Sequence, residues 1–485
     1  MKRNTLIIIA TMLTGWLTPS FAQTQQKEVH ILSGNDMHAK LENMPMLADI
    51  ADSLRTLYPS LLVFSAGDNR TGEPLNDMYE PTGYPMVALM NQIGFDATTL
   101  GNHEFDSSPR GMAKLIGLST FSYICANVHP DDSLGVHLIP CKTYDVEGIR
   151  VGVVGAVQLG THGLPDTHPD NTKGLTFDPV NETVASYEWM RKKCDVVMLL
   201  SHNGYEEDVQ TAKLMPWLDV IIGGHTHTQL KGGEMHNGVL ITQNVNKLKK
   251  VTHTTIVLQR NSDSDSWRIA SKSAENIDVQ EHKGKNKVVA DMVRFFSDNP
   301  DFKQVLATLD KPLTTYEELG CLMCDAFISE AGADVGIENY GGVRYGEKEA
   351  GPFTVADVLR LDPFGNDAVI MEITGEELRQ MLMSCYTNDG KNFPYVSGLM
   401  CELERDSKDT TEIKKLTLKN AEGKKLNMKK KYKVVTNSYV ASIADSPRKD
   451  QGQNINRKTA DLIIDFLKKK QTVDYKGAAR IKIVK

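Results

Sequence analysis

The chain has 485 residues, enough for two or three domains that each bury a core of their own. Apolar residues make up 40% and charged residues 24%, which is ordinary globular usage and excludes collagen-like, coiled-coil and wholly disordered chains. The formal net charge of −7 repels nucleic acid and anionic lipid, so neither is an expected partner. Seven cysteines are an odd number, so at least one thiol stays unpaired and a disulfide scaffold is excluded.

Residues 1–22 have the order of a secretory signal peptide. Lys2 and Arg3 precede a mostly apolar run at 6–17, and small residues follow up to Ala22. The apolar run is shorter than the ~20 residues that span a bilayer, so a membrane anchor is the less favoured alternative. We expect cleavage after Ala22, no stable membrane insertion, and export to the periplasm if the source is Gram-negative or to the medium otherwise.

Residues 23–260 have the pattern of an α/β domain, in which short β-rich runs alternate with helical stretches. Expected strands are 29–32, 61–64, 149–157, 196–200 and 220–222, and expected helices are 84–93 and 109–118. Strand after strand ends in Gly, Asn, Asp or His. Because ligands of α/β sheets bind where the strands end, we expect the functional site there.

Residues 261–310 are expected to form a linker, since 261–284 is polar and turn-rich and 288–296 has the spacing of an interdomain helix. Residues 311–485 read as an α+β domain, with helices at 316–331 and 374–384 and strands at 368–373, 415–418 and 432–436. Cys321 and Cys324 share one face of the first of these helices, where buried packing is favoured over a redox pair. The lysine-rich segment 424–433 is expected to be a solvated hairpin rather than a nucleic-acid patch.

Five strand ends carry residue types that bind metals. The seven candidate metal-binding residues are Asp36, His38, Asp68, Asn102, His202, His225 and His227. A lone loop histidine is usually structural, but this set in this order favours a metal site. Imidazole and carboxylate ligands suit Zn²⁺ or Mn²⁺, and the donors are too many for one such ion. Two divalent ions that share a bridging carboxylate fit the count and predict phosphoester hydrolysis.

These motifs resemble those of a known family. Asp36-x-His38, Gly67-Asp68-Asn69, Gly101-Asn102-His103-Glu104-Phe105-Asp106, Ser201-His202 and Gly224-His225-Thr226-His227 look like those of calcineurin-like metallophosphatases, specifically the 5′-nucleotidase family. The resemblance implies a four-layer α/β/β/α metallophosphatase domain followed by a smaller α+β substrate-binding domain. It implies one ion on Asp36, His38 and His227, a second on Asn102, His202 and His225, and Asp68 as the bridge. It also implies a catalytic His103 oriented by Asp106, and a metal-bound hydroxide as nucleophile.

The second half resembles the C-terminal domain of the same family. The stretch 339–344 is similar to its Asn-x-Gly-Gly-x-Arg signature, which implies that Arg344 binds phosphate, as the guanidinium fork allows. The stretch 362–366 is similar to its Pro-Phe-Gly-Asn loop, which implies that Phe364 stacks on the base and that Asn366 bonds the nucleoside. Spacing aligns Tyr439 with the second stacking residue and Asp445 with a ribose-binding aspartate, although the family's glycines are missing between them.

The expected function is therefore release of phosphate from nucleoside 5′-monophosphates, in a cleft between two domains that move about a hinge. The same metal pair would serve a nucleotide-sugar pyrophosphatase or a 2′,3′-cyclic-nucleotide phosphodiesterase. From another class, an exported, non-catalytic nucleotide-binding or adhesion protein is the alternative. The expected partner is the nucleotide substrate, and the sequence makes no prediction of the oligomeric state.

Overall fold

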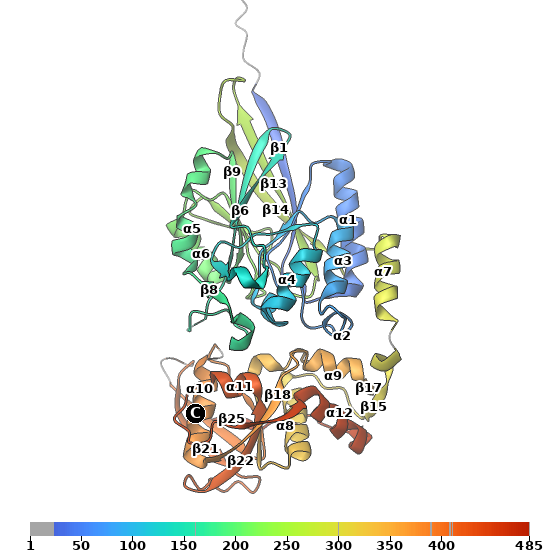
Figure 1. The fold of residues 1–485 in the computed structure, drawn as a ribbon, viewed down its shortest axis with the longest axis vertical. Coiled ribbons are helices and arrows are strands. Elements are labelled where there is room, and N and C mark those ends of the chain that lie inside the picture. Colours follow the sequence, from blue (N-terminus) through green and yellow to red (C-terminus); the bar gives the residue numbers. More distant parts are fainter. Residues whose placement is uncertain are drawn as a thin grey trace, which may run out of the picture.

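A computed structural model describes residues 24–484 except 161, 299, 389, 407, 408 and 410. The expected signal peptide and its cleavage point lie outside the described residues. Figure 1 shows two halves stacked along the long axis, the first coloured blue to yellow and the second orange to red. None of the helices in the described part of the chain has both the length and the apolar character needed to cross a bilayer.

The first half is built on two six-stranded sheets. The first sheet has the order β14 (Arg268–Asp278), β13 (Lys250–Arg260), β1 (Gln25–Gly34), β2 (Leu62–Ser65), β3 (Ala97–Thr98), β4 (Ser122–Tyr123). The second has the order β11 (Glu234–His236), β12 (Val239–Thr242), β10 (Val220–Ile222), β9 (Val196–His202), β7 (Ile149–Val157), β6 (Cys141–Val146). Strands β1 to β4 run parallel, as do β7, β9, β10 and β12, so their carboxyl ends lie at common edges.

Successive side chains of each strand point to opposite faces of its sheet, and this alternation gives the first half four layers. Ile31 of β1 lies in the core between the two sheets, whereas its neighbour Leu32 lies in the core beneath the helices. On the second sheet, Met198 faces the shared core and Leu199 faces the opposite helical layer. The first helical layer contains α1 (Met44–Leu57), α3 (Tyr84–Ile93), α4 (Pro109–Leu118) and α7 (Lys287–Ser297), and the other contains α5 (Val180–Ala185) and α6 (Tyr205–Leu214). The four-layer α/β/β/α architecture is confirmed.

The second half has a central mixed sheet with helices on both faces. Its order is β19 (Tyr395–Ser397), β16 (Val335–Glu338), β22 (Lys431–Asn437), β18 (Asp367–Thr374), β23 (Gln453–Lys458). One core contains side chains of α8 (Tyr316–Ala331), α9 (Val355–Leu361) and α12 (Thr459–Lys470). The other contains α10 (Gly375–Asn388), α11 (Ser438–Ile443) and the sheet β21 (Ile413–Lys419), β20 (Met400–Arg405), β25 (Ile481–Val484). A small sheet of β17 (Gly351–Thr354), β15 (Val305–Leu309) and β24 (Thr472–Val473) lies beside α12.

Several expected elements have the bounds that the sequence predicted, because local signals mark their ends. Helix α8 begins at a capping box in which Thr315 and Glu318 bond each other's backbone N–H, and it ends at Gly332 with φ of 59°. Cys321 and Cys324 are buried in that helix, and burial raises the pKa of Cys321 to about 12, so the packing interpretation is confirmed. All seven cysteines are free.

The segment 261–284, expected to be an irregular strand-and-loop exit from the first domain, is more regular than expected. Residues 268–278 form β14, a regular strand of 11 residues that pairs with β13. As a sheet edge it tolerates polar residues, which is why its sequence resembled a loop. Helix α7 lies beside α1 and α3 (Figure 1). Its Val289 and Phe296 are buried in the first half's core. Lys424 and Lys425 lie in an exposed turn closed by a bridge between Lys419 and Lys425, as expected.

Candidate metal centre and interdomain cleft

The expected metal-binding residues lie on loops that leave one edge of the two sheets. Asp36 and His38 follow β1, Asp68 follows β2, and Asn102 and His103 follow β3. His202 ends β9, and His225 and His227 follow β10. The parallel strands in each sheet therefore bring residues far apart in the sequence to a common place.

The backbone of these loops is held in an uncommon conformation. Residues with positive φ are Asp36 (48°), His38 (44°), Asp68 (50°), His225 (78°) and His227 (54°). Non-glycine residues rarely adopt this region, and its cost is tolerated mainly where the surrounding structure requires a particular side-chain direction. Glycine is required beside them: a Cβ on Gly67 would lie 2.6 Å from the backbone nitrogen of Gly101. The loops after β2 and β3 thus approach more closely than any side chain at Gly67 would allow.

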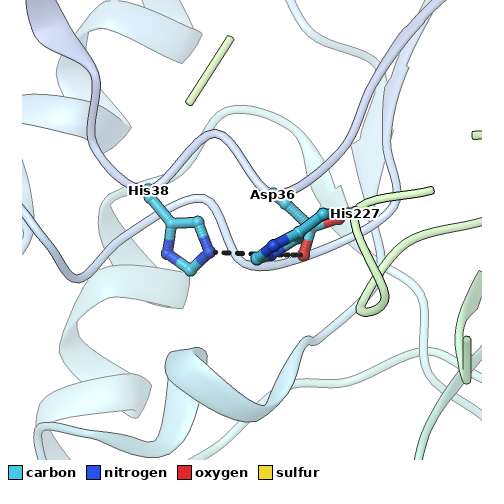
Figure 2. Close-up of side chains that lie close together, drawn as sticks. All are labelled: Asp36, His38 and His227. Carbon is cyan, nitrogen blue, oxygen red and sulfur yellow. Dashed lines mark hydrogen bonds and ion pairs between the residues drawn. The ribbon is translucent and has the colours of Figure 1, made fainter. Parts of the chain in front are cut away.

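Asp36, His38 and His227 form the first donor group (Figure 2). His227 Nε2 lies 3.3 Å from Asp36 Oδ1 and 3.4 Å from His38 Nε2. His38 Nδ1 donates to the carbonyl of Thr71 at 3.0 Å, which leaves the Nε2 lone pair facing His227. Burial, and then the charge of Arg344, hold the pKa of His38 well below its usual range. The imidazole is therefore neutral, as a metal ligand must be.

Asp68 and His202 lie at the centre of the second donor group. His202 Nε2 is 3.2 Å from Asp68 Oδ2, while its Nδ1 donates to the carbonyl of Ala66 at 2.6 Å. His202 is fully buried, and its Nε2 forms no hydrogen bond with the described residues. Burial opposes ionisation of Asp68, but His202 and His103 outweigh it and hold the Asp68 pKa well below its usual range.

Asn102 and His225 face each other beside that pair. Asn102 Oδ1 and His225 Nδ1 are 3.1 Å apart, and Asn102 Nδ2 donates to the carbonyl of Asp166 at 3.1 Å. Burial, and then the charge of His202, lower the pKa of His225 to about 4, so the ring is neutral. When Nδ1 of His225 carries no proton, its lone pair and Asn102 Oδ1 both face the space between the two side chains.

The donor set fits divalent cations. Three close pairs, His38 with His227, Asp68 with His202, and Asn102 with His225, place potential ligand atoms within 3.4 Å of one another. Burial opposes protonation of His202, but the carboxylate of Asp68 outweighs it and raises the His202 pKa to about 10, so a metal ion at this place would have to displace the Nε2 proton. Asp68 belongs to two of the compact donor groups, one with His38 and His103 and one with Asp36 and His202. Imidazole, carboxylate and amide oxygen are donors that Zn²⁺ and Mn²⁺ accept.

His103 and Asp106 form a pair at the edge of this centre. Asp106 Oδ2 accepts a hydrogen bond from His103 Nδ1 at 2.7 Å, and the His103 backbone N–H donates to Asp68 Oδ1 at 2.8 Å. Burial would lower the pKa of His103, but the carboxylates of Asp106 and Asp68 outweigh it and raise the pKa. The ring also stacks on Phe364 of the second half, with centroids 5.8 Å apart.

A cavity of about 330 Å³ lies between the halves and is lined by the remaining expected residues except Asp445. Its lining includes Asp68, His103, Arg344, Phe364, Asn366 and Tyr439. The guanidinium of Arg344 lies over the Phe364 ring, 5.3 Å from its centroid. Ser438 Oγ donates to Asn366 Oδ1 at 3.0 Å, which leaves the Asn366 amide N–H₂ as the group available to a ligand.

Asp445 is the expected substrate residue that the fold does not bring to this cavity. Its side chain is exposed, and it is not among the described residues that line the cavity. The segment after α11 turns away at Ala444, whose backbone N–H donates to the carbonyl of Val440. Asn388 and Asn392, for which sequence analysis assigned no role, line the cavity near Tyr439 instead.

Glu104 is a further residue to which the sequence interpretation gave no role. Its carboxylate accepts hydrogen bonds from the backbone N–H groups of Gly101 at 2.6 Å, Asp68 at 2.9 Å and Asn69 at 2.9 Å. It thereby ties the loop after β2 to the loop after β3. The sequence signal that could have indicated this role is an acidic residue beside glycine-containing loops, because such loops expose several backbone N–H donors.

Family sequence models match both halves of the chain. A model described as calcineurin-like phosphoesterase matches residues 30–229. A model described as 5′-nucleotidase, C-terminal domain matches residues 304–447. The two matches occur in the order that the motifs predicted.

Individual proteins match over most of the chain. A trifunctional nucleotide phosphoesterase protein of Bacillus subtilis is 24% identical over 91% of this chain, which spans only 34% of that protein. A 5′-nucleotidase of Vibrio parahaemolyticus is 25% identical over 97% of this chain and 96% of its own length. The solved structure of a 5′-nucleotidase precursor from Thermus thermophilus superposes with a TM-score of 0.81 at 23% identity, covering 94% of this chain and 99% of that one, which shows a common fold.

Proposed function

The chain belongs to the 5′-nucleotidase family of calcineurin-like phosphoesterases, and from that premise we propose that it releases phosphate from nucleoside 5′-monophosphates. The observation that carries the proposal is the convergence of the metal donors and the His103–Asp106 pair on a cavity that also holds Arg344 and Phe364. A phosphoryl group beside the donors would leave its nucleoside near the aromatic residues.

Asp36, His38 and His227 would hold one divalent ion, Asn102, His202 and His225 a second, and Asp68 would contact both. When bound, two such ions activate water and neutralise charge on a phosphoryl group. The backbone bonds of His38 and His202 fix which ring nitrogen of each is free. The buried bonds around Asp68 and Glu104 keep the donors in place without reorganisation.

Hydrolysis adds water to phosphorus and breaks the bond to the nucleoside oxygen, which must gain a proton. Asp106 accepts from His103 Nδ1, so Nε2 is the ring nitrogen available to donate that proton or to bond a phosphoryl oxygen. The carboxylates of Asp106 and Asp68 raise the pKa of His103, which favours the protonated ring that this role requires. Phe364 stacks on the His103 ring and limits the access of water to that ring.

Recognition of the nucleoside is assigned to the second half. Arg344 would bond phosphate oxygens, Phe364 and Tyr439 would stack on the base, and the Asn366 amide would bond the nucleoside. Asp445 lies outside the cavity in this arrangement of the halves. Ribose recognition by Asp445 would therefore require a different arrangement of the halves.

The test is the rate of hydrolysis, measured by chromatography of the products, across nucleoside mono- and diphosphates, nucleotide sugars and 2′,3′-cyclic nucleotides. We expect a 5′-monophosphate to be cleaved fastest, with activity lost on chelation and restored by Mn²⁺ or Zn²⁺. Preference for a nucleotide sugar or a cyclic nucleotide would contradict the proposed substrate but would agree with the proposed metal centre. Tight nucleotide binding with no turnover in the presence of metal would instead establish a binding protein.

We further propose that the chain is exported after removal of residues 1–22. The support is the order of charged, apolar and small residues at the start of the sequence. N-terminal sequencing of protein from the periplasmic or culture fraction should begin at Gln23. A cytoplasmic chain that keeps Met1 would contradict export.

A further inference from the structure

One wall of the cavity is formed by the segment that precedes the short helix at Pro169–Thr172 in the first half. Asp166 and Thr167 of this segment and Asn171 of the helix line the cavity. Thr167 is only 8% exposed, and its hydroxyl donates to Asp106 Oδ1 at 3.1 Å. The Asn171 amide in turn donates to Thr167 Oγ1 at 3.4 Å, so the hydroxyl proton is directed at Asp106.

The Asp106 carboxylate is therefore held at both oxygens. Oδ2 accepts from His103 Nδ1 at 2.7 Å, and Oδ1 accepts from Thr167. A carboxylate fixed at one oxygen can still rotate about its Cβ–Cγ bond, and it then ceases to orient the ring that it bonds. The second hydrogen bond removes that freedom.

The neighbouring residue makes a parallel contact. The backbone carbonyl of Asp166 accepts from Asn102 Nδ2, which turns Asn102 Oδ1 toward His225. Two consecutive residues, Asp166 and Thr167, thus bond Asn102, which precedes His103, and Asp106, which lies three residues after it. This contact uses a backbone group, so a change of the Thr167 side chain leaves its donor and acceptor intact.

We propose that Thr167 is a positioning residue that orients the His103 ring through Asp106. The inference rests on the proposed function, because it acts through His103. Loss of the hydroxyl should lower the rate of the chemical step without changing substrate binding. The expected effect is about a tenfold loss of kcat, the scale of one hydrogen bond to a charged group.

The experiment compares Thr167→Val, which keeps the side-chain shape and removes the hydroxyl, with Thr167→Ser, which keeps it. Thr172→Val is the matched control: Thr172 is also buried and lies in the adjoining helix, but its hydroxyl donates to the Pro169 carbonyl. We expect about a tenfold lower kcat with unchanged KM and metal content for Thr167→Val, near-normal kcat for Thr167→Ser, and no change for Thr172→Val.

A double-mutant cycle with His103→Ala separates positioning from general loosening of the fold. If Thr167 acts through His103, Thr167→Val should have no further effect on kcat in the His103→Ala background. An equal loss in both backgrounds, or a normal kcat for Thr167→Val alone, would overturn the proposal.

The cycle is measured on a nucleoside 5′-monophosphate and on phenyl phosphate, which has no base or sugar. Turnover of phenyl phosphate alone would refute the nucleotide proposal while still testing Thr167. The loss should be larger for either of these than for p-nitrophenyl phosphate, whose leaving group needs little protonation. Equal losses on all three esters would contradict positioning of a proton donor.

Discussion

Arg360 of the second half forms a two-pronged ion pair with Glu73 of the first: Nε lies 3.0 Å from Oε2, and Nη2 lies 3.0 Å from Oε1. The Glu73 side chain is only 4% exposed. Burial raises its pKa, and Arg360 opposes that rise by favouring the charged form. The pair joins the two halves in the same arrangement in which Phe364 lies against His103. It therefore favours the arrangement that completes the cavity.

Removing this cation should weaken nucleotide turnover without touching the metal donors. We expect Arg360→Ala to lower kcat/KM for a nucleoside monophosphate by roughly three- to thirtyfold, because a buried carboxylate loses its partner in the closed arrangement. Lys348→Ala is the control, since Lys348 pairs with Asp357 within the second half. Steady-state kinetics decide the matter, and equal effects of the two variants would show that the Arg360–Glu73 pair does not stabilise the productive arrangement.

His103→Ala should lower kcat by about a hundredfold or more while the metal content stays the same, as expected for a proton donor that is not a ligand. His129→Ala is a matched control, because His129 forms the same type of pair, 2.7 Å from Asp178, at a half-exposed position away from the cavity. Kinetics and elemental analysis are measured on the same samples. Loss of an ion on His103→Ala would make the residue a ligand instead.

Phe364→Ala should weaken nucleotides more than small esters. A base that stacks on this ring contributes about 1 to 3 kcal/mol, so KM for a nucleoside monophosphate should rise roughly tenfold or more, whereas KM for phenyl phosphate should change little. Phe295→Ala, at a 72% exposed position on α7, serves as control. Equal increases for both substrates would contradict base stacking.

Asp362, two residues before Phe364, should make stability depend on pH. It is 3% exposed, its Oδ2 has no hydrogen-bond partner among the described residues, and burial raises its pKa to about 6. The folded state therefore binds the proton more tightly than the unfolded chain, so stability falls as pH rises from about 4 to 6, by at most about 3 kcal/mol.

Asp362→Asn should abolish this fall. The melting temperature of the variant relative to the natural chain should therefore rise between pH 4 and pH 7, whereas exposed Asp132→Asn should show no such trend. A constant difference in melting temperature at every pH would mean that the charged, buried Asp362 carboxylate does not destabilise the fold.

Sequence alone indicated that the candidate metal-binding residues lie together because two simple constraints act together. Parallel strands bring their carboxyl ends to one edge, and Asp36, Asp68, Asn102 and His202 occur within a few residues of such ends. Helix bounds were predictable where a cap is local, as at the Thr315 capping box. In these cases the determining interactions lie within a few residues along the chain.

Other features depend on contacts that no local pattern reveals. Thr167 reaches Asp106 across 61 residues, and nothing in its neighbours indicates that contact. The polar strand β14 exists because β13 offers it a partner at a sheet edge. Asp445 was assigned by spacing, but without the glycines the backbone after Tyr439 continues as helix α11 to Ile443, and Asp445 remains at the surface.

The most direct test of the whole account is the metal content of active protein, measured by elemental analysis alongside phosphate release from a nucleoside 5′-monophosphate. The account predicts two divalent ions per chain at full activity, and loss of both ions and activity after chelation. Full activity with one ion or none per chain would contradict it.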